Sequence, residues 1–173
     1  VGHAMGSQVG YVADGIFKSQ EEVDNHATQE GAALGRIRWK DLDNSGDITE
    51  ADQQWIYDPT PDFTYGFNIY LEYKNFDITA FFQGVQGVDI ISDLKKETDI
   101  WAGLNIGYLN KGSRLLNAWS PTNPNSNIPA VTLSDNNNEK RVSSYWVENG
   151  SYLKLRTVQL GYNLPKAFLQ MLA

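Results

Sequence analysis

The sequence contains no cysteine, and this absence by itself excludes several kinds of chemistry. Without thiols the protein has no disulfide framework, no thiolate nucleophile and no cysteine-ligated metal. Only two histidines, His3 and His26, occur among the 173 residues, and neither accompanies a nucleophile motif. Since no catalytic constellation is visible, we do not expect an enzyme.

Positive charge and long apolar runs are also scarce. Fourteen Lys and Arg residues against 21 Asp and Glu residues give a formal net charge of -7. The basic face that phosphate binding requires is therefore missing, and nucleic acid is not an expected partner. No run approaches the roughly 18 apolar residues of a membrane helix, so any membrane span must consist of strands. Because the sequence starts without Met and closes on the apolar run 167–173, we expect a piece of something longer.

Strict alternation of apolar and polar residues is what the sequence does have. One run places its apolar side chains on a single strand face, at Tyr65, Phe67, Ile69, Leu71 and Tyr73. A second run follows the pair Lys74-Asn75, with apolar residues at Phe76, Ile78, Ala80 and Phe82. The two runs predict a tight antiparallel hairpin over residues 63–83. Strands of about 9 to 11 residues also suit a tilted crossing of a bilayer.

The other segments are less regular. Residues 1–62 are expected to form a loop region, in which the capping-box spacing of Ser19 and Glu22 predicts a short helix over residues 20–27. Residues 84–142 show no sustained periodicity, so we expect a long loop. Further strands are expected within residues 143–164, at 143–147 and 152–164. The second carries Val158, Leu160 and Tyr162 on its apolar face.

The sharpest motif is the acidic segment 41–52, which matches the spacing of an EF-hand-like calcium loop. Gly46 occupies the position where such a loop turns sharply, and Ile48 is the apolar residue that anchors it. Oxygen atoms at positions one, three, five, seven and twelve would bind Ca²⁺, the seventh through its backbone carbonyl: Asp41, Asp43, Ser45, Asp47 and Asp52. Ser45 and Asp52 are weaker ligands than the residues usual at their positions. A solvated acidic turn without metal is the alternative.

Aromatic residues in or beside the long loop form a second candidate site. Their rings could stack on sugar rings or on a partner protein, or they could pack within the loop itself. The residues are Trp101, Tyr108, Trp119, Tyr145 and Trp146.

Four groups of segments follow one another in a recognisable order. They are GYVADGIFKSQEEVD at 10–24, GRIRWKDLDNSGD at 35–47, PTPDFTYG at 59–66 with YKNFD at 73–77 and FFQG at 81–84, and finally ENGSYLKLR at 148–156 with LGYNLP at 160–165. Taken together, this order and spacing resemble the C-terminal barrel region of SusC/RagA-type TonB-dependent outer-membrane transporters.

The resemblance implies an all-β fold, in which antiparallel strands form a segment of a large transmembrane β-barrel with long loops and one or two short helices. It places the chain in the outer membrane of a Gram-negative bacterium, without a plug domain. The implied partners are a SusD-like surface lipoprotein, TonB through N-terminal parts missing here, outer-membrane lipid, and an oligosaccharide or peptide ligand. The implied function is import of oligosaccharides or similar nutrients.

A soluble module is the alternative to a barrel segment. In a calcium-stabilised carbohydrate-binding or adhesion module, the same apolar strand faces would form the core of a sandwich. Periodicity alone does not separate the two readings, because one apolar face per strand satisfies both.

Overall fold

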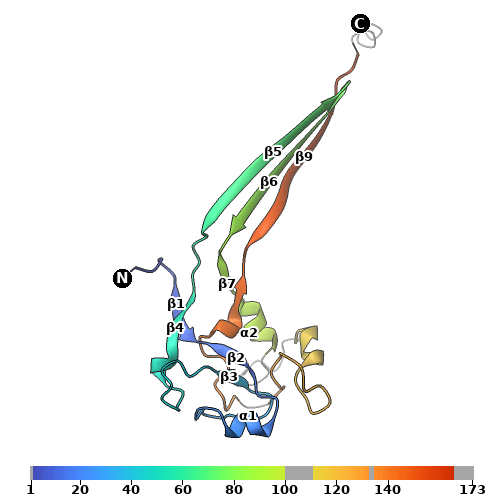
Figure 1. Ribbon diagram of the computed structural model, residues 1–173. Coiled ribbons are helices and arrows are strands. Elements are labelled where there is room, and N and C mark those ends of the chain that lie inside the picture. Colours follow the sequence, from blue (N-terminus) through green and yellow to red (C-terminus); the bar gives the residue numbers. More distant parts are fainter. Residues whose placement is uncertain (1, 100–110, 133–134, 166–173) are drawn as a thin grey trace. The chain divides into compact units, whose positions relative to one another are not determined.

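The computed structural model describes residues 2–99, 111–132 and 135–165, and the chain divides into two compact units (Figure 1). Unit 1 comprises residues 1–59 and 90–148, and unit 2 comprises residues 60–89 and 149–173. Each unit is therefore assembled from two stretches that are distant in sequence. Among the described residues, none of the helices has the length and apolar character needed to cross a membrane.

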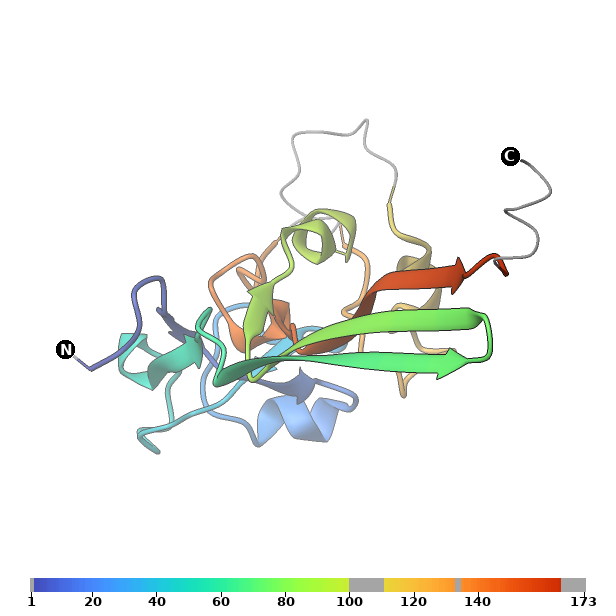
Figure 2. The same cartoon turned by 90° about the horizontal axis from the view of Figure 1, so that it is seen from above.

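Unit 2 is a three-stranded antiparallel sheet with the strand order β5-β6-β9 (Figures 1 and 2). The strands β5 (Phe63–Tyr73), β6 (Phe76–Gln86) and β9 (Tyr152–Tyr162) each contain 11 residues. Lys74, at the tight turn between β5 and β6, adopts a left-handed backbone with φ of 55°. The hairpin expected over residues 63–83 extends to Gln86, and β9 joins it from a distant part of the sequence.

A β-bulge in β9 keeps one face of this sheet apolar. Phe81 pairs with Thr157 and Phe82 with Leu155, so Arg156 is the additional residue. A bulge of this kind shifts the alternation by one position. Its effect here is that apolar residues before and after it share a face with those of β5 and β6: Tyr65, Phe67, Ile69, Leu71, Tyr73, Phe76, Ile78, Ala80, Phe82, Leu153, Leu155, Val158, Leu160 and Tyr162.

Unit 1 contains short strand pairs. The antiparallel pairs are β1 (Gln8–Tyr11) with β4 (Gln53–Tyr57), and β2 (Ala13–Ile16) with β3 (Ile37–Trp39). A further pair, β7 (Asp89–Ile91) with β8 (Val147–Asn149), lies where the chain passes from one unit to the other. The helical turns are α1 (Gln20–Asp24), α2 (Asp93–Asp99), η1 (Glu50–Asp52), η2 (Ser113–Asn117) and η3 (Ser144–Trp146). Residues 1–62, which were expected to form a loop region with one short helix, thus also contain the two strand pairs β1–β4 and β2–β3.

Two local predictions need correction. The helix that starts after Ser19 ends at Asp24 and not at residue 27, because His26 turns inward and its Nε2 lies 2.9 Å from the carbonyl oxygen of Trp39. The strand expected at 143–147 is instead the turn η3 followed by β8. This turn buries Trp146 against Ile91. The prediction of an extended strand did not include this contact.

The apolar core of unit 1 is small. Its fully buried hydrophobic residues, among those described, are Ile16, Phe17, Ile37, Trp39 and Trp146. Apolar burial contributes about 25 cal/mol per Å², so a core of this size supplies limited stabilisation. Directed polar contacts must therefore contribute much of the local order in unit 1.

Candidate functional site

Three carboxylates of the segment 41–52 converge. Asp41, Asp43 and Asp52 each place a carboxylate oxygen within 4.8 Å of the other two. Asp41 accepts hydrogen bonds from the backbone N–H of Ser45 at 3.3 Å and of Gly46 at 2.9 Å, and Asp43 accepts from the same Ser45 N–H at 2.9 Å. Backbone N–H groups within the loop therefore orient the first two carboxylates.

Asp52 is the buried member of this group and holds the two ends of the loop together. Its carboxylate accepts from the N–H of Leu42 at 2.7 Å and from the N–H of Thr49 at 2.7 Å. Burial acts to raise the pKa of Asp52, but the hydrogen bonds from Thr49, Leu42 and Asp43 bring the pKa below its usual value. The Asp52 carboxylate is therefore ionised at neutral pH, and its oxygen atoms can act as metal ligands.

Ser45 and Asp47, the remaining expected ligands, are joined to each other. The hydroxyl of Ser45 donates to the backbone carbonyl of Asp47 at 3.0 Å, and that carbonyl is the group predicted to bind Ca²⁺. Gly46 supplies the sharp turn with φ of 86°. The loop thus brings three carboxylates together and holds the Ser45 hydroxyl against the Asp47 carbonyl, and oxygen atoms of these kinds suit a hard cation such as Ca²⁺.

The loop is anchored to the rest of unit 1 through Thr28. The N–H of Thr28 donates to the carbonyl of Gly46 at 2.7 Å, and the N–H of Ile48 donates to the carbonyl of Thr28 at 2.8 Å. These two bonds form a short parallel bridge between Thr28 and Asp47. The position of the carboxylates is therefore tied to the segment that leads into Gln29.

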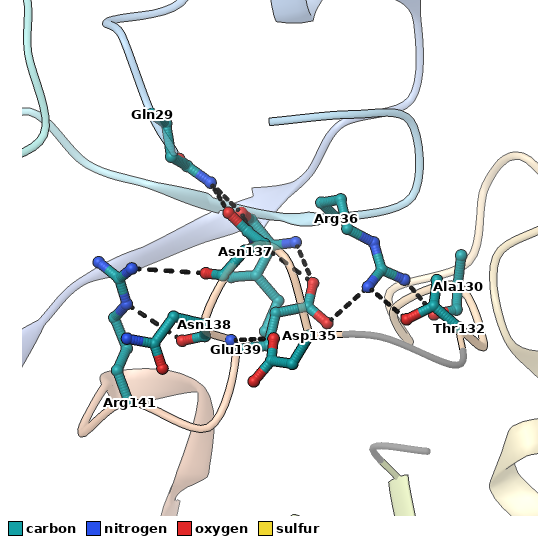
Figure 3. Close-up of polar contacts among 10 residues, drawn as sticks. Gln29, Arg36, Ala130, Thr132, Asp135, Asn137, Asn138, Glu139 and Arg141 are labelled. Atoms are coloured by element: carbon teal, nitrogen blue, oxygen red, sulfur yellow. Dashed lines mark hydrogen bonds and ion pairs between the residues drawn. The ribbon is translucent and has the colours of Figure 1, made fainter. Parts of the chain in front are cut away.

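Gln29 belongs to a buried polar network that sequence reasoning missed (Figure 3). One edge of β3 pairs with β2, and side chains satisfy the backbone groups on its other edge. The Gln29 amide donates to the Ile37 carbonyl at 2.7 Å and accepts from the N–H of Trp39 at 2.9 Å, while the Asn137 amide donates to the same Ile37 carbonyl at 2.9 Å. Since a buried unpaired backbone group is costly, these side chains replace a missing neighbouring strand.

A buried ion pair completes this network. Nη1 of Arg36 lies 3.0 Å from Oε2 of Glu139, and both side chains are almost fully buried. The other Glu139 oxygen accepts from the N–H of Ile37 at 2.9 Å, and Arg36 also donates to the carbonyl of Ala130 (Figure 3). Burial raises the pKa of Glu139 even though the Arg36 charge acts in the opposite direction. The network thus ties Ala130, Asn137 and Glu139 to β3 and to Arg36, the residue that precedes it.

Tyr145 and Trp146 are held inside unit 1. Trp146 is 2% exposed, and its ring meets the Tyr145 ring edge-on at 4.8 Å between centroids. Nζ of Lys95 lies 4.3 Å above the Tyr145 ring and donates to the Tyr145 carbonyl at 2.7 Å. Burial raises the pKa of the Tyr145 hydroxyl far above its usual value. This geometry favours packing, the alternative given above to ligand contact, for both rings.

Trp119 is the described aromatic candidate that lines an open groove. The groove encloses about 460 Å³ and is bordered by Leu115, Leu116 and Pro121 as well as Trp119. Trp101 and Tyr108 lie outside the described residues. Of the three described candidates, Trp119 lines this groove, whereas Tyr145 and Trp146 pack against each other and do not line it.

Comparisons with known proteins agree on one family. No family model matches the chain. Among curated proteins, TonB-dependent receptor P3 of Formosa agariphila is 41% identical over 169 residues, which are 97% of this chain and 16% of the relative. TonB-dependent receptor P26 of the same organism is 34% identical over 151 residues, which are 87% of this chain and 15% of that relative.

A solved structure of the RagAB peptide transporter resembles the chain with a TM-score of 0.66 and 25% identity, over 93% of this chain and 17% of that chain. The chain thus spans about one sixth of the length of the relatives that it matches. These relatives are receptors and transporters and not enzymes, and the family resides in the outer membrane, so the soluble module loses its support. The chain is a strand-built part of a transmembrane barrel and belongs to the TonB-dependent receptors of the SusC/RagA type.

Proposed function

We propose that this chain supplies part of the wall and of the loops of an outer-membrane importer of oligosaccharides or similar nutrients. In this proposal the whole receptor works with a SusD-like surface lipoprotein and draws energy from TonB. Family membership supports the proposal, and the single structural observation that carries it is the continuous apolar face of the sheet in unit 2.

The dimensions of this sheet match a bilayer. Eleven residues at about 3.3 Å each, tilted by about 40°, rise roughly 28 Å, which is enough to span the apolar band of about 25 Å on outer-membrane barrels. Many side chains on the apolar face are exposed within this chain, among them Leu71, Val158 and Leu160. Contact with lipid would remove this apolar surface from water, as in other transmembrane barrels.

Aromatic residues flank the apolar face at both of its ends, as interfacial girdles do in membrane barrels. Phe63 and Tyr65 lie at one end, and their rings are 5.7 Å apart. Phe76 and Tyr162 lie beside the hairpin turn with their rings 4.6 Å apart, and Tyr73 is next to them in register. Since barrels place tight turns in the periplasm, the proposal orients the Lys74-Asn75 turn toward the periplasm.

The opposite face of the sheet is mainly polar, although it also carries Tyr70, Phe81, Val85 and Tyr152, and it suits the interior of a barrel. Its residues include Thr64, Asn68, Glu72, Asp77, Thr79, Gln83, Lys154 and Gln159. A water-filled or plugged lumen accepts such side chains, whereas lipid does not. The alternation of the two faces thus supports a wall that separates lipid from a polar interior.

Growth and pull-down experiments test the importer proposal. A strain that lacks the full-length receptor should lose growth on at least one oligosaccharide as sole carbon source, and the receptor gene should restore it. An affinity-tagged receptor should also retain a surface lipoprotein through purification. Because RagAB is named as a peptide transporter, the growth panel includes short peptides. Normal growth of the mutant on every glycan, with growth on peptides lost, would overturn the oligosaccharide assignment.

The segment 41–52 is the calcium site of this proposal. Support comes from the three converged carboxylates, the Ser45 hydroxyl and the Asp47 carbonyl described above. Loops that bind Ca²⁺ outside the cytosol reach Kd values of about 10⁻⁴ to 10⁻³ M, and the weak ligand at position twelve favours this range. At such affinities Ca²⁺ would order the loop without acting as a switch.

Calorimetric titration of the detergent-solubilised receptor with Ca²⁺ tests this assignment. The substitution Asp43→Ala should abolish the binding heat, since it removes one of three converged carboxylates. Asp24→Ala is the matched control, because Asp24 is an exposed carboxylate of α1 outside the loop. Absence of heat at millimolar Ca²⁺ in the unsubstituted receptor, or equal heats for the two variants, would remove the calcium assignment.

A further inference from the structure

A polar pocket of about 300 Å³ lies within unit 1, beside the segment 41–52. Thr49 and Glu50 form one part of its lining, and Glu30 and Arg141 also face it. Both glutamates are exposed, whereas Arg141 is half-buried. The pocket therefore combines acidic groups with one cation in a volume suited to a single small residue.

The guanidinium of Arg141 is held in a fixed position. Its Nε donates to the Asn138 carbonyl at 3.1 Å and its Nη2 to the Asn137 carbonyl at 3.4 Å (Figure 3). Its central carbon lies 4.7 Å from the centroid of the Tyr11 ring and 5.3 Å from that of the Trp39 ring. These contacts restrict a side chain that would otherwise lose entropy on binding a ligand.

The two hydrogen bonds to backbone carbonyls leave some N–H donors of the Arg141 guanidinium free. A guanidinium carries five N–H donors in a planar fork, so about three of them remain after these two hydrogen bonds. Because Nε and Nη2 serve the carbonyls, the free donors belong mainly to Nη1 and to the outer side of Nη2. That arrangement suits end-on, bidentate binding of a carboxylate.

Arg141 also differs from the other arginines of unit 1. Arg36, Arg38 and Arg114 each form an ion pair, with Glu139, with Asp14 and Glu22, and with Asp99 respectively. Within the described part of the chain, no carboxylate oxygen lies within the 4.0 Å of an ion pair to Arg141, although the chain carries a net charge of -7. Because this guanidinium is held rigidly and has no carboxylate partner among the described residues, it can bind the anionic group of a ligand.

We propose that this pocket binds the terminal carboxylate of a short peptide, end-on at Arg141, and favours a basic terminal residue whose cation faces Glu30 and Glu50. A peptide fits better than an acidic sugar because the pocket offers no free ring for stacking. The Tyr11 ring that lines it is already covered by the Arg141 guanidinium. This peptide pocket would be separate from the oligosaccharide path of the importer proposed above, so neither proposal rests on the other. Binding can be measured without uptake.

The test uses the full-length receptor in detergent and the tripeptide Gly-Gly-Lys as the probe, followed by calorimetry. The free acid should bind, and its C-terminal amide should bind at least about tenfold more weakly, because the amide lacks the charged acceptor. Arg141→Lys keeps the charge but loses the fork, and it should cause a similar loss. Lys140→Met is the matched control, since it removes a neighbouring positive charge from outside the pocket lining.

The preference for a basic terminal residue is tested separately. Replacing Glu30 and Glu50 by Gln should reduce the preference for Gly-Gly-Lys over Gly-Gly-Gly while binding of the latter persists. Equal binding of acid and amide, or of the unsubstituted receptor and Arg141→Lys with unchanged thermal melts, would overturn the proposal. Tighter binding of glucuronate than of the tripeptide would overturn the peptide assignment. These outcomes are binding measurements, whereas the importer proposal is tested by growth. Failure of one proposal can therefore be distinguished from failure of the other.

Discussion

Ile69 and Asn68 are adjacent residues, yet the same substitution should strongly destabilise the protein at Ile69 and have little effect at Asn68. They lie at the middle of β5, which runs from Phe63 to Tyr73. Ile69 pairs with Ala80 and lies on the apolar face, whereas Asn68 pairs with Phe81 and lies on the polar face. If the apolar face contacts lipid, Ile69→Arg places a charge near the middle of the bilayer. Asn68→Arg places it in the polar interior of the barrel.

The expected difference can be worked out from depth. An arginine on the lipid face costs about 2–4 kcal/mol at the bilayer midplane and about 0–1 kcal/mol near an interface. Ile69→Arg should therefore reduce the free energy of unfolding by about 2–4 kcal/mol. Tyr73→Arg, at the aromatic end of the same face, should cost about 1 kcal/mol or less. Asn68→Arg should stay within about 0.5 kcal/mol, as surface changes usually do.

Urea titration of the full-length receptor, refolded into lipid vesicles and followed by tryptophan fluorescence, measures these free energies. The sheet core of a soluble module would give a different pattern, since Tyr73→Arg would then not be spared by its nearness to an interface. Equal costs for Ile69→Arg and Asn68→Arg would refute the assignment of the two faces. A larger cost for Asn68→Arg would reverse it.

Two further predictions concern unit 1 and are measured by thermal melts and hydrogen exchange of the same receptor. Gly46→Ala should cost about 1–2 kcal/mol through its left-handed backbone alone, because nothing lies near the new methyl group. Gly31→Ala should cost clearly more, since its Cβ would lie 2.1 Å from the Asn136 carbonyl oxygen, and equal costs would contradict the packing described. Glu139→Ala should lower the free energy of unfolding by about 3–5 kcal/mol, because it leaves the buried Arg36 without its partner. It should also speed hydrogen exchange of the amides along β3, since the Ile37 N–H loses its acceptor. Adding Arg36→Met should recover part of that loss, and a purely additive double variant would argue against the ion pair.

The hairpin of unit 2 was accessible from sequence because its pattern is local. Tyr73 and Phe76 pair across a two-residue turn, so a period of two on either side is enough to define the strands. The pairing of β6 with β9 was not accessible, since it joins Val85 to Tyr152 across a long intervening segment. The strand itself was predicted over residues 152–164, but the bulge at Arg156 changes the phase of the alternation, so the sequence did not reveal that Leu153 and Leu155 share the apolar face of Val158.

The candidate sites divide in the same way. The acidic loop could be identified because all its oxygen donors, from Asp41 to Asp52, lie within twelve consecutive residues whose spacing sets their geometry. Arg141 could not be identified, since its role depends on Tyr11 and Trp39, which are more than a hundred residues away in sequence. An arginine after an asparagine-rich run carries no local signal that it is stacked, anchored and without a carboxylate.

The acidic loop 41–52 and the pocket of Arg141 are both supported by the segment that contains Thr28 and Gln29. Thr28 anchors the acidic loop through its backbone, and the next residue, Gln29, closes the open edge of β3 and lines the pocket of Arg141. With so small an apolar core, the order of this segment rests on hydrogen bonds more than on burial. A perturbation of the acidic loop should therefore reach the pocket through Thr28 and Gln29, before it affects the sheet of unit 2. Hydrogen exchange that rises at Ile48 and Trp39 together after Asp43→Ala, with β5 unchanged, is the pattern that this shared support requires.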